Sequence, residues 1–390
     1  MRIWFIVLCS FVFFACSQKT EFVKAHHYNT NSSNTNHTLE KYENIWGYHN
    51  DEYLLLYGNA KAYLFDMFGN KYREWKTNIK RAQLLKNCNL MVVDNNQKNS
   101  LAEKNYNGEI IWSHEIPGFT HHDFEITDDG HITFFYNKPM PKDFKLTNGC
   151  QHEDLLTDVI IEVDRDHHEY FKWDFSNYFP TVLNRPYICN AAALKRQKES
   201  SFSKMIDRIH PNSVDILQDN KWWREGYQEF KPGNLIITMH HLNAFMIIDK
   251  ETKLPVWYYD GLQDQEDGLI DGIHEAKMIA AGLPGAGNII FIDNGKHHRK
   301  YTVVKEINPI TKKTVWSYKK PGEFFTEFAG SWQRLKNGDT FISDDSNGRV
   351  FVVDKKGNIK FQFVAQRLDG KQPWVKRARL YSKKEFAQCL

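Results

Sequence analysis

The segment GDTFISDDSNGRVFVVDKKGNIKF, residues 338–361, decides the fold of this chain. It contains two apolar runs that each end in aspartate, then a polar turn, and then the aromatic residue Phe361. Short apolar runs separated by turn residues are typical of antiparallel strands and not of helices. The segment therefore predicts two paired strands and the beginning of a third.

The same pattern recurs along the chain. Ile237–Asp249 aligns with Ile342–Asp354 without a gap, so that Asp345 takes the place of His240. With the weaker copies included, six units close on an aromatic residue: Trp75, Trp112, Trp173, Trp257, Trp316 and Phe361. Six units of about four strands each predict an all-β, six-bladed β-propeller, which leaves no long exposed sheet edge. A large β-sandwich is the alternative, but a sandwich gives no reason for a repeated closing tryptophan.

The composition fits this fold and excludes one class of partner. The chain is 41% hydrophobic, enough for a buried core, and 14% aromatic, which favours strands. Its net charge is +3, with Lys and Arg interleaved with Asp and Glu throughout. A nucleic-acid-binding protein concentrates its basic residues on one face. The sequence therefore predicts no nucleic-acid partner.

The beginning of the chain predicts export. Residues 1–16 have the features of a lipoprotein-type signal peptide: a positive start, an apolar run too short to span a bilayer as a helix, and Cys16 as the residue to be acylated. Residues 17–40 are a disordered tether, 41–365 the propeller, and 366–390 a basic tail that forms a surface segment or a closing strap. We expect an exported, periplasmic protein that a lipid anchors to a bacterial membrane, with the outer membrane favoured.

Insertions and cysteines add two further expectations. Residues 138–158 and 174–208 interrupt the repeat, and 191–196 within the second insertion is a good helix former. Long insertions in a propeller lie on one face and often shape the site. No CxxC pair is present, which argues against a zinc ribbon. An oxidising compartment would allow a disulfide between Cys150 and Cys189, and the sequence does not decide whether it forms.

Histidines mark the beginnings of several units. His122, His210 and His274 open three consecutive units, and His240 and His241 follow the first full strand of the middle one. Because the innermost strands of all blades meet at the propeller axis, these imidazoles are predicted to converge. A single buried histidine is usually a hydrogen-bonded core residue, whereas ionisable groups that converge in a concavity mark a site.

The residues around these histidines resemble a known family. They are His122-Asp123, IHPNSVD at 209–215, LIITMHHLNA at 235–244, His274-Glu275-Ala276 and NIIFIDNG at 288–295. In this order and spacing they are similar to the PAPS-independent arylsulfate sulfotransferases, the arylsulfotransferase (ASST) family. The resemblance implies a six-bladed propeller that transfers a sulfuryl group from a phenolic sulfate ester to a phenolic acceptor, with no cofactor and no metal.

The resemblance also implies roles for the histidines. His274 matches the family's nucleophile, which carries the sulfuryl group as a sulfohistidine between the two steps of a ping-pong reaction. His122 and His210 match the histidines that assist it. His240 falls where the family has an arginine, and this is a departure, because a guanidinium is always charged whereas an imidazole is not.

Further residues are expected to belong to the site. His240 is expected to act with the catalytic histidines, and His241, Asn212 and Arg299 to bind substrate, with Arg299 a candidate source of the missing charge. Glu275 is a candidate to orient the nucleophile by a hydrogen bond.

Two other functions remain open. His122, His210, His240 and His274 supply enough nitrogen ligands for zinc or copper, although the helical HExxH-type spacing is absent. The second open function is non-catalytic: the propeller would be a decayed enzyme scaffold that binds a ligand or partner. The departure from the family's arginine at His240 favours this function. The sequence does not indicate the natural donor, the acceptor or the oligomeric state.

Overall fold

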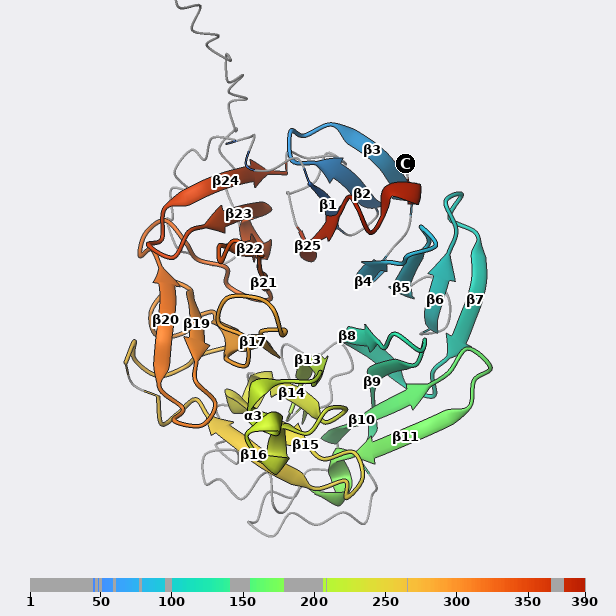
Figure 1. Ribbon diagram of the computed structural model, residues 1–390. Coiled ribbons are helices and arrows are strands. Elements are labelled where there is room, and N and C mark those ends of the chain that lie inside the picture. Colours follow the sequence, from blue (N-terminus) through green and yellow to red (C-terminus); the bar gives the residue numbers. More distant parts are fainter. Residues whose placement is uncertain are drawn as a thin grey trace, which may run out of the picture.

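The structure is a computed structural model in which six sheets surround a common axis (Figure 1). It describes Ile45, Tyr48 and residues 51–58, 61–76, 79–94, 100–140, 155–178, 206–207, 209–264, 266–365 and 375–389. Each sheet is an antiparallel meander of four strands, and one sheet carries an additional short strand. The predicted all-β, six-bladed propeller is confirmed.

The first three blades each run from an innermost strand at the axis to an outermost strand at the rim. Blade one has β25 (Arg377–Ser382), β1 (Glu52–Tyr57), β2 (Lys61–Asp66) and β3 (Lys71–Lys76); blade two has β4 (Ile79–Leu84), β5 (Leu90–Asp94), β6 (Ser100–Lys104) and β7 (Ile110–Glu115); blade three has β8 (Phe119–Ile126), β9 (Ile132–Pro139), β10 (Leu155–Val163) and β11 (Glu169–Asp174). The additional strand β12 (Ile206–Asp207) pairs with β10 in parallel.

The other three blades follow the same order. Blade four has β13 (Pro211–Ile216), β14 (Leu235–Met239), β15 (Ala244–Ile248) and β16 (Pro255–Asp260); blade five has β17 (Ile273–Met278), β18 (Ile289–Asp293), β19 (Val303–Ile307) and β20 (Thr314–Lys319); blade six has β21 (Ser331–Arg334), β22 (Thr340–Asp344), β23 (Arg349–Val353) and β24 (Ile359–Val364). Short helices are η1 (Phe175–Asn177), α3 (Lys221–Arg224), η3 (Gln228–Phe230), η4 (His240–Leu242), η5 (Asp345–Asn347) and η6 (Ala387–Cys389).

The two middle strands of a blade form most of the core. β14, β15, β18, β19, β22 and β23 are buried along their whole length, because both faces of the sheet pack against neighbouring blades. The outermost strands β7 and β20 alternate between partly buried and mainly exposed residues, as expected for strands with one face towards solvent. Continuous apolar runs in the sequence therefore mark the middle of each blade.

The closing aromatic residue of each unit lies on the outermost strand. Four of these tryptophans donate from Nε1 to a carbonyl in the last turn of the next blade, at 2.8–3.1 Å: Trp112 to Arg165, Trp173 to Lys253, Trp257 to Pro309 and Trp316 to Lys355. A repeated bond between neighbouring blades explains why the sequence repeats a tryptophan at this place, since an indole combines a large apolar ring with one donor.

The ring closes through the end of the chain. β25 pairs with β1 in antiparallel register, Arg377 opposite Tyr57, and is the innermost strand of blade one (Figure 1). The propeller thus extends beyond residue 365, where the repeat pattern ended it, and part of the expected basic tail is the closing strap. The repeat pattern does not reveal this strand, because the three outer strands of its blade, including the one with the closing tryptophan, come from the other end of the sequence.

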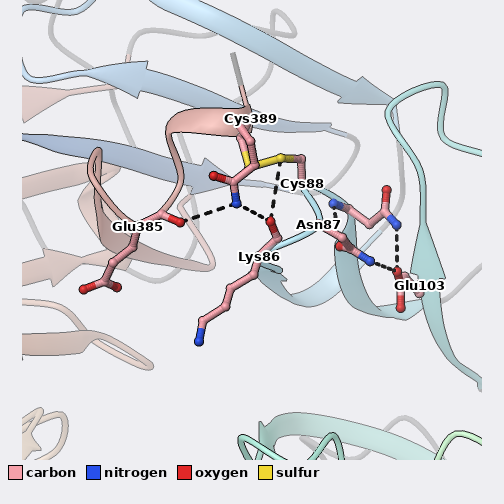
Figure 2. Close-up of a disulfide and its surroundings, with 8 residues drawn as sticks. Lys86, Asn87, Cys88, Glu103, Glu385 and Cys389 are labelled. Atoms are coloured by element: carbon pink, nitrogen blue, oxygen red, sulfur yellow. Dashed lines mark hydrogen bonds between the residues drawn. A yellow bond between two sulfur atoms is a disulfide. The ribbon is translucent and has the colours of Figure 1, made fainter.

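A disulfide fastens the closed ring. Cys88, in the turn after β4, is bonded to Cys389 of η6, with a Cα–Cα distance of 4.9 Å (Figure 2). Beside it, the Gln388 amide donates to the Lys86 carbonyl. This pair was not predicted, and Cys150 and Cys189 lie outside the described residues. The bond links η6, which follows β25, to blade two across a sequence separation of 301 residues.

Replacing Cys88 or Cys389 with serine is expected to reduce the free energy of unfolding by about 2–5 kcal/mol, because the cross-link closes a very long loop in the unfolded chain. The double variant should lose no more than either single variant, since each removes the same bond. Denaturant unfolding of all three, with wild type measured with and without reductant, tests this. Wild type that is insensitive to reductant would contradict it.

Several sequence expectations fall outside the described residues. They are the signal peptide with Cys16, the tether, and most of both insertions, including the helix expected at 191–196. Within the described ranges, no helix is both long and apolar enough to cross a membrane.

Candidate functional site

The structure brings the five histidines of interest into one cluster near the axis. His122 lies on β8, His210 directly before β13, His240 and His241 in η4, and His274 on β17. The ring centroids are 4.5 Å apart for His122 and His210, 4.7 Å for His210 and His241, 5.6 Å for His210 and His240, and 4.6 Å for His240 and His274. We call these five residues the histidine cluster.

Irregular inner strands aim these side chains. The pairing register shifts on β8, β13 and β17 at the histidines or directly after them. At these places His122, His210 and Glu275 have left-handed backbone conformations, with φ of 62°, 51° and 54°. Such conformations are costly for residues other than glycine and persist only where the surroundings hold them. Bulges of this kind turn a side chain out of the regular alternation of a strand, and they are common next to sites.

The tautomer of His274 follows from its hydrogen bonds. Its Nδ1 lies 2.6 Å from Asn294 Oδ1 and 3.1 Å from the Gly272 carbonyl oxygen. The Asn294 amide group donates to the carbonyls of Thr326 and Ala329, at 2.7 and 3.0 Å, which fixes its oxygen towards the ring. Both partners of Nδ1 are acceptors, so Nδ1 carries the proton and Nε2 the lone pair.

Burial keeps His274 neutral. The residue is 8% exposed. Burial lowers the pKa of His274 to about 3, against the bonds to Asn294 and Gly272 that favour the charged form, and the charges of His210 and Arg377 lower it further. A neutral imidazole with a defined lone pair is the reactive form of a nitrogen nucleophile.

His240 is also neutral. Burial, and then the nearby rings of His274 and His241, lower the pKa of His240 well below its ordinary value. Its Nδ1 donates to the Ile273 carbonyl at 3.3 Å. An imidazole held neutral does not supply the permanent charge of the arginine that the family has at this place.

His210 has the opposite preference. Its Nδ1 lies 2.5 Å from Asp207 Oδ2, and its backbone N–H donates to the other oxygen of the same carboxylate at 3.0 Å. Burial disfavours the imidazolium, but the Asp207 carboxylate outweighs it and raises the pKa of His210. Burial and the Asp207 charge also raise the pKa of Asp158. The cluster therefore joins a neutral imidazole to one that binds a proton readily.

The predicted substrate-binding residues have other contacts. His241 donates from Nδ1 to the Asp207 backbone carbonyl at 2.7 Å. Asn212 is 1% exposed, and its amide donates to the Ile273 carbonyl at 2.8 Å, next to His274. Arg299 is paired with Asp293 at 2.5 Å and donates to the Asp267 carbonyl. Asn212 thus supports the strand that carries His274. Arg299 forms its ion pair with Asp293 and not with a residue of the histidine cluster.

A buried ionic network beside the cluster was missed. Asp123, which follows His122, accepts from Arg81 Nε at 2.6 Å and from Arg377 Nη1 at 2.8 Å, and Arg377 Nη2 donates to Glu275, which follows His274. Lys277 pairs with Glu125 in the same network. The expectation that Glu275 orients His274 is wrong: Asn294 and Gly272 bond its Nδ1, and Glu275 is taken up by Arg377.

The groups that have the geometry to hold a metal ion differ from the four histidines of the alternative metal hypothesis. One ligand atom each from Asp207, His210 and His241 lie within 4.8 Å of one another, as do those of Asp164, Asp166 and His168. Among the described residues, the four histidines of the alternative metal hypothesis do not form such a group. Asp207 contacts both His210 and His241 through hydrogen bonds, an arrangement that orients imidazoles as well as it prepares a ligand set.

The ring of six sheets with imidazoles at its inner strands defines a propeller with a histidine-based site. A model of the Arylsulfotransferase (ASST) family matches residues 81–366. The chain belongs to the arylsulfotransferase family, as its motifs predicted.

A solved structure with a TM-score above 0.5 shares the fold. A protein of unknown function from Bacteroides caccae is 12% identical, with a TM-score of 0.53 over 85% of this chain and 98% of the other. Virginiamycin B lyase from Staphylococcus aureus is 10% identical, with a TM-score of 0.42 over 83% of this chain and 87% of the other. No match was found among curated proteins.

Proposed function

We propose that the protein is an aryl-sulfate sulfotransferase that works through a sulfohistidine on His274. The observation that carries the proposal is the pairing of a neutral His274, protonated at Nδ1, with a chain of imidazoles that leads to the Asp207–His210 pair. The donor is a phenolic sulfate ester and the acceptor a phenol, as the family implies.

In the first step, Nε2 of His274 attacks sulfur, the N–S bond forms and the S–O bond to the aryl oxygen breaks. The proton of the His210 imidazolium passes to the departing phenolate, and a phenol leaves. The His274 ring now carries positive charge, and its Nδ1–H remains bonded to Asn294 and Gly272, which stabilises this charge.

In the second step, the hydroxyl of the acceptor attacks sulfur. The new S–O bond forms, the N–S bond breaks, and neutral His210 takes the proton of the hydroxyl. Neutral His274 and protonated His210 are restored. No proton or electron has to come from outside this cycle, so the residues of the cluster suffice for both steps.

The test is to trap the intermediate. The purified protein is mixed with 4-nitrophenyl sulfate without an acceptor, and we expect one equivalent of 4-nitrophenol and a sulfuryl adduct on His274 in peptide mass spectra. Addition of a phenol should discharge the adduct and restore turnover. A protein that binds aryl sulfate with no phenol release and no adduct would be the non-catalytic propeller, and the proposal would fail.

Replacing Asp207 with Asn is expected to lower activity at neutral pH about 10- to 100-fold, because His210 loses the charge that raises its pKa. A lower pKa leaves less imidazolium, so the alkaline limb of the pH–rate profile should move to lower pH by roughly one to three units. Asp354→Asn, on an exposed turn, is the control. An unchanged alkaline limb in the Asp207 variant would remove the pair from the mechanism.

We also propose that the chain is exported and anchored through Cys16. The signal-like start supports this, and so does the Cys88–Cys389 disulfide, since such bonds persist in oxidising compartments. Membrane fractionation is the measurement: wild type should sediment with membranes, and a Cys16→Ser protein found there in equal amount would refute the anchor.

A further inference from the structure

We propose that Arg377, delivered by the last strand of the chain, is a positioning residue that holds the nucleophile and an assisting histidine in one fixed geometry. This proposal rests on the proposed function for the meaning of the two histidines. Neither the family motifs nor the match over residues 81–366 includes this arginine.

Arg377 lies where it can act on both histidines. One guanidinium nitrogen donates to Asp123 and another to Glu275. Asp123 directly follows His122, and Glu275 directly follows His274. The side chains of the three charged residues are 0–8% exposed. A planar, permanently charged group thus spans the two strands β8 and β17 at the points where they present their imidazoles.

The backbone at these points needs such support. His122 and Glu275 have left-handed conformations, which cost free energy and relax if the surroundings allow it. Arg81 holds Asp123 from a second side, but of the two arginines only Arg377 pairs with both carboxylates. Loss of Arg377 leaves Glu275 with Lys277 at 3.7 Å. Lys277 also pairs with Glu125, so it is a poor substitute.

The strand that carries Arg377 is firmly placed. β25 pairs with β1, and from the other side Ser331 Oγ donates to the Ala378 carbonyl while Gln333 exchanges two bonds with Leu380. The disulfide holds the segment that follows. Arg377 is therefore fixed to three blades before it reaches Asp123 and Glu275.

The charge of Arg377 also affects the pKa of His274. It is among the causes that lower the pKa of His274, together with burial and the charge of His210, and the neutral His240 packs against the same ring. Glu275 and Lys277 lie on the strand of His274 itself. Removal of the guanidinium should therefore raise the pKa of His274 and also loosen its position.

The experiment separates charge from position. Arg377→Met is expected to lower kcat/KM about 100-fold, the loss associated with a misplaced reacting group, and to raise the pKa of His274, which is measured by NMR of the imidazole nitrogens. Arg377→Lys keeps the charge but cannot span both carboxylates, so its His274 pKa should stay near that of wild type while activity remains at least 10-fold low. Arg379→Met, two residues along the same strand, is the control and should match wild type.

Glu275→Gln should reproduce the activity loss of Arg377→Met, and it carries the test if the methionine variant does not fold. An Arg377→Lys protein as active as wild type would overturn the positioning role. So would Arg377→Met with unchanged kinetics and titration. If wild type shows no transfer from aryl sulfates, the proposed function fails, and the His274 titration and line widths in the variants still decide whether Arg377 positions the ring.

Discussion

Replacing His274 with alanine is expected to lower sulfuryl transfer from aryl sulfates by at least 10³-fold, because the atom that accepts the sulfuryl group is lost in both steps. The measurement is 4-nitrophenol release under single-turnover conditions and at steady state. The trapped adduct should disappear with the activity. His297→Ala is the matched control, since His297 is largely exposed and pairs with Asp271 outside the cluster.

Added imidazole sharpens this prediction. If the defect is a missing nucleophile, free imidazole should restore part of the phenol release in His274→Ala and none in an Asp207→Asn protein. A His274→Ala enzyme that retains wild-type rates would show that another group attacks sulfur. The neighbouring His240 is the first candidate for that group, because it too is neutral and lies 4.6 Å from the His274 ring.

The repeat in the sequence predicts the ring of blades because every blade packs against its neighbours in the same way and needs the same residue types at the same places. Two buried strands need continuous apolar runs, and the outer strand needs an aromatic residue that bonds to the next blade, as Trp257 does to Pro309. The convergence of His122, His210 and His274 follows from the same logic, since inner strands occupy equivalent places around the axis. These features depend on position within a unit, which sequence periodicity records.

The remaining features depend on contacts between distant segments. Arg377 and Cys389 carry no repeat signal, because they act on blades far away in the sequence. Asn294, and not Glu275 as the sequence suggested, bonds the ring of His274. Glu275 has a left-handed backbone conformation, and its carboxylate bonds Arg377. A residue type and its neighbours in the sequence do not specify this conformation. The Asn294 amide, in the motif NIIFIDNG at 288–295, was the available signal for the partner of His274.

Replacing Asn294 with leucine is expected to lower kcat/KM by about 10²- to 10⁴-fold, the range associated with a catalytic imidazole that loses the group fixing its tautomer. The side chain keeps a similar size, but Nδ1 of His274 retains only the longer bond to the Gly272 carbonyl. The ring can then place its proton on Nε2, where it blocks attack. NMR of the imidazole nitrogens reports the tautomer directly, and the fraction protonated at Nε2 should rise with the loss of activity.

Asn347→Leu is the control for loss of buried amide bonds. Asn347, in η5, donates to the Phe325 carbonyl and to Asp344, much as Asn294 donates to Thr326 and Ala329, but no histidine is among these partners. Both variants should lose similar stability, and only Asn294→Leu should lose activity. Asn294→Asp separates the cause further: a carboxylate restores the acceptor but raises the pKa of His274 from about 3, so activity should return mainly at higher pH. An Asn294→Leu enzyme with wild-type tautomer and rate would mean that the Gly272 carbonyl alone orients the nucleophile.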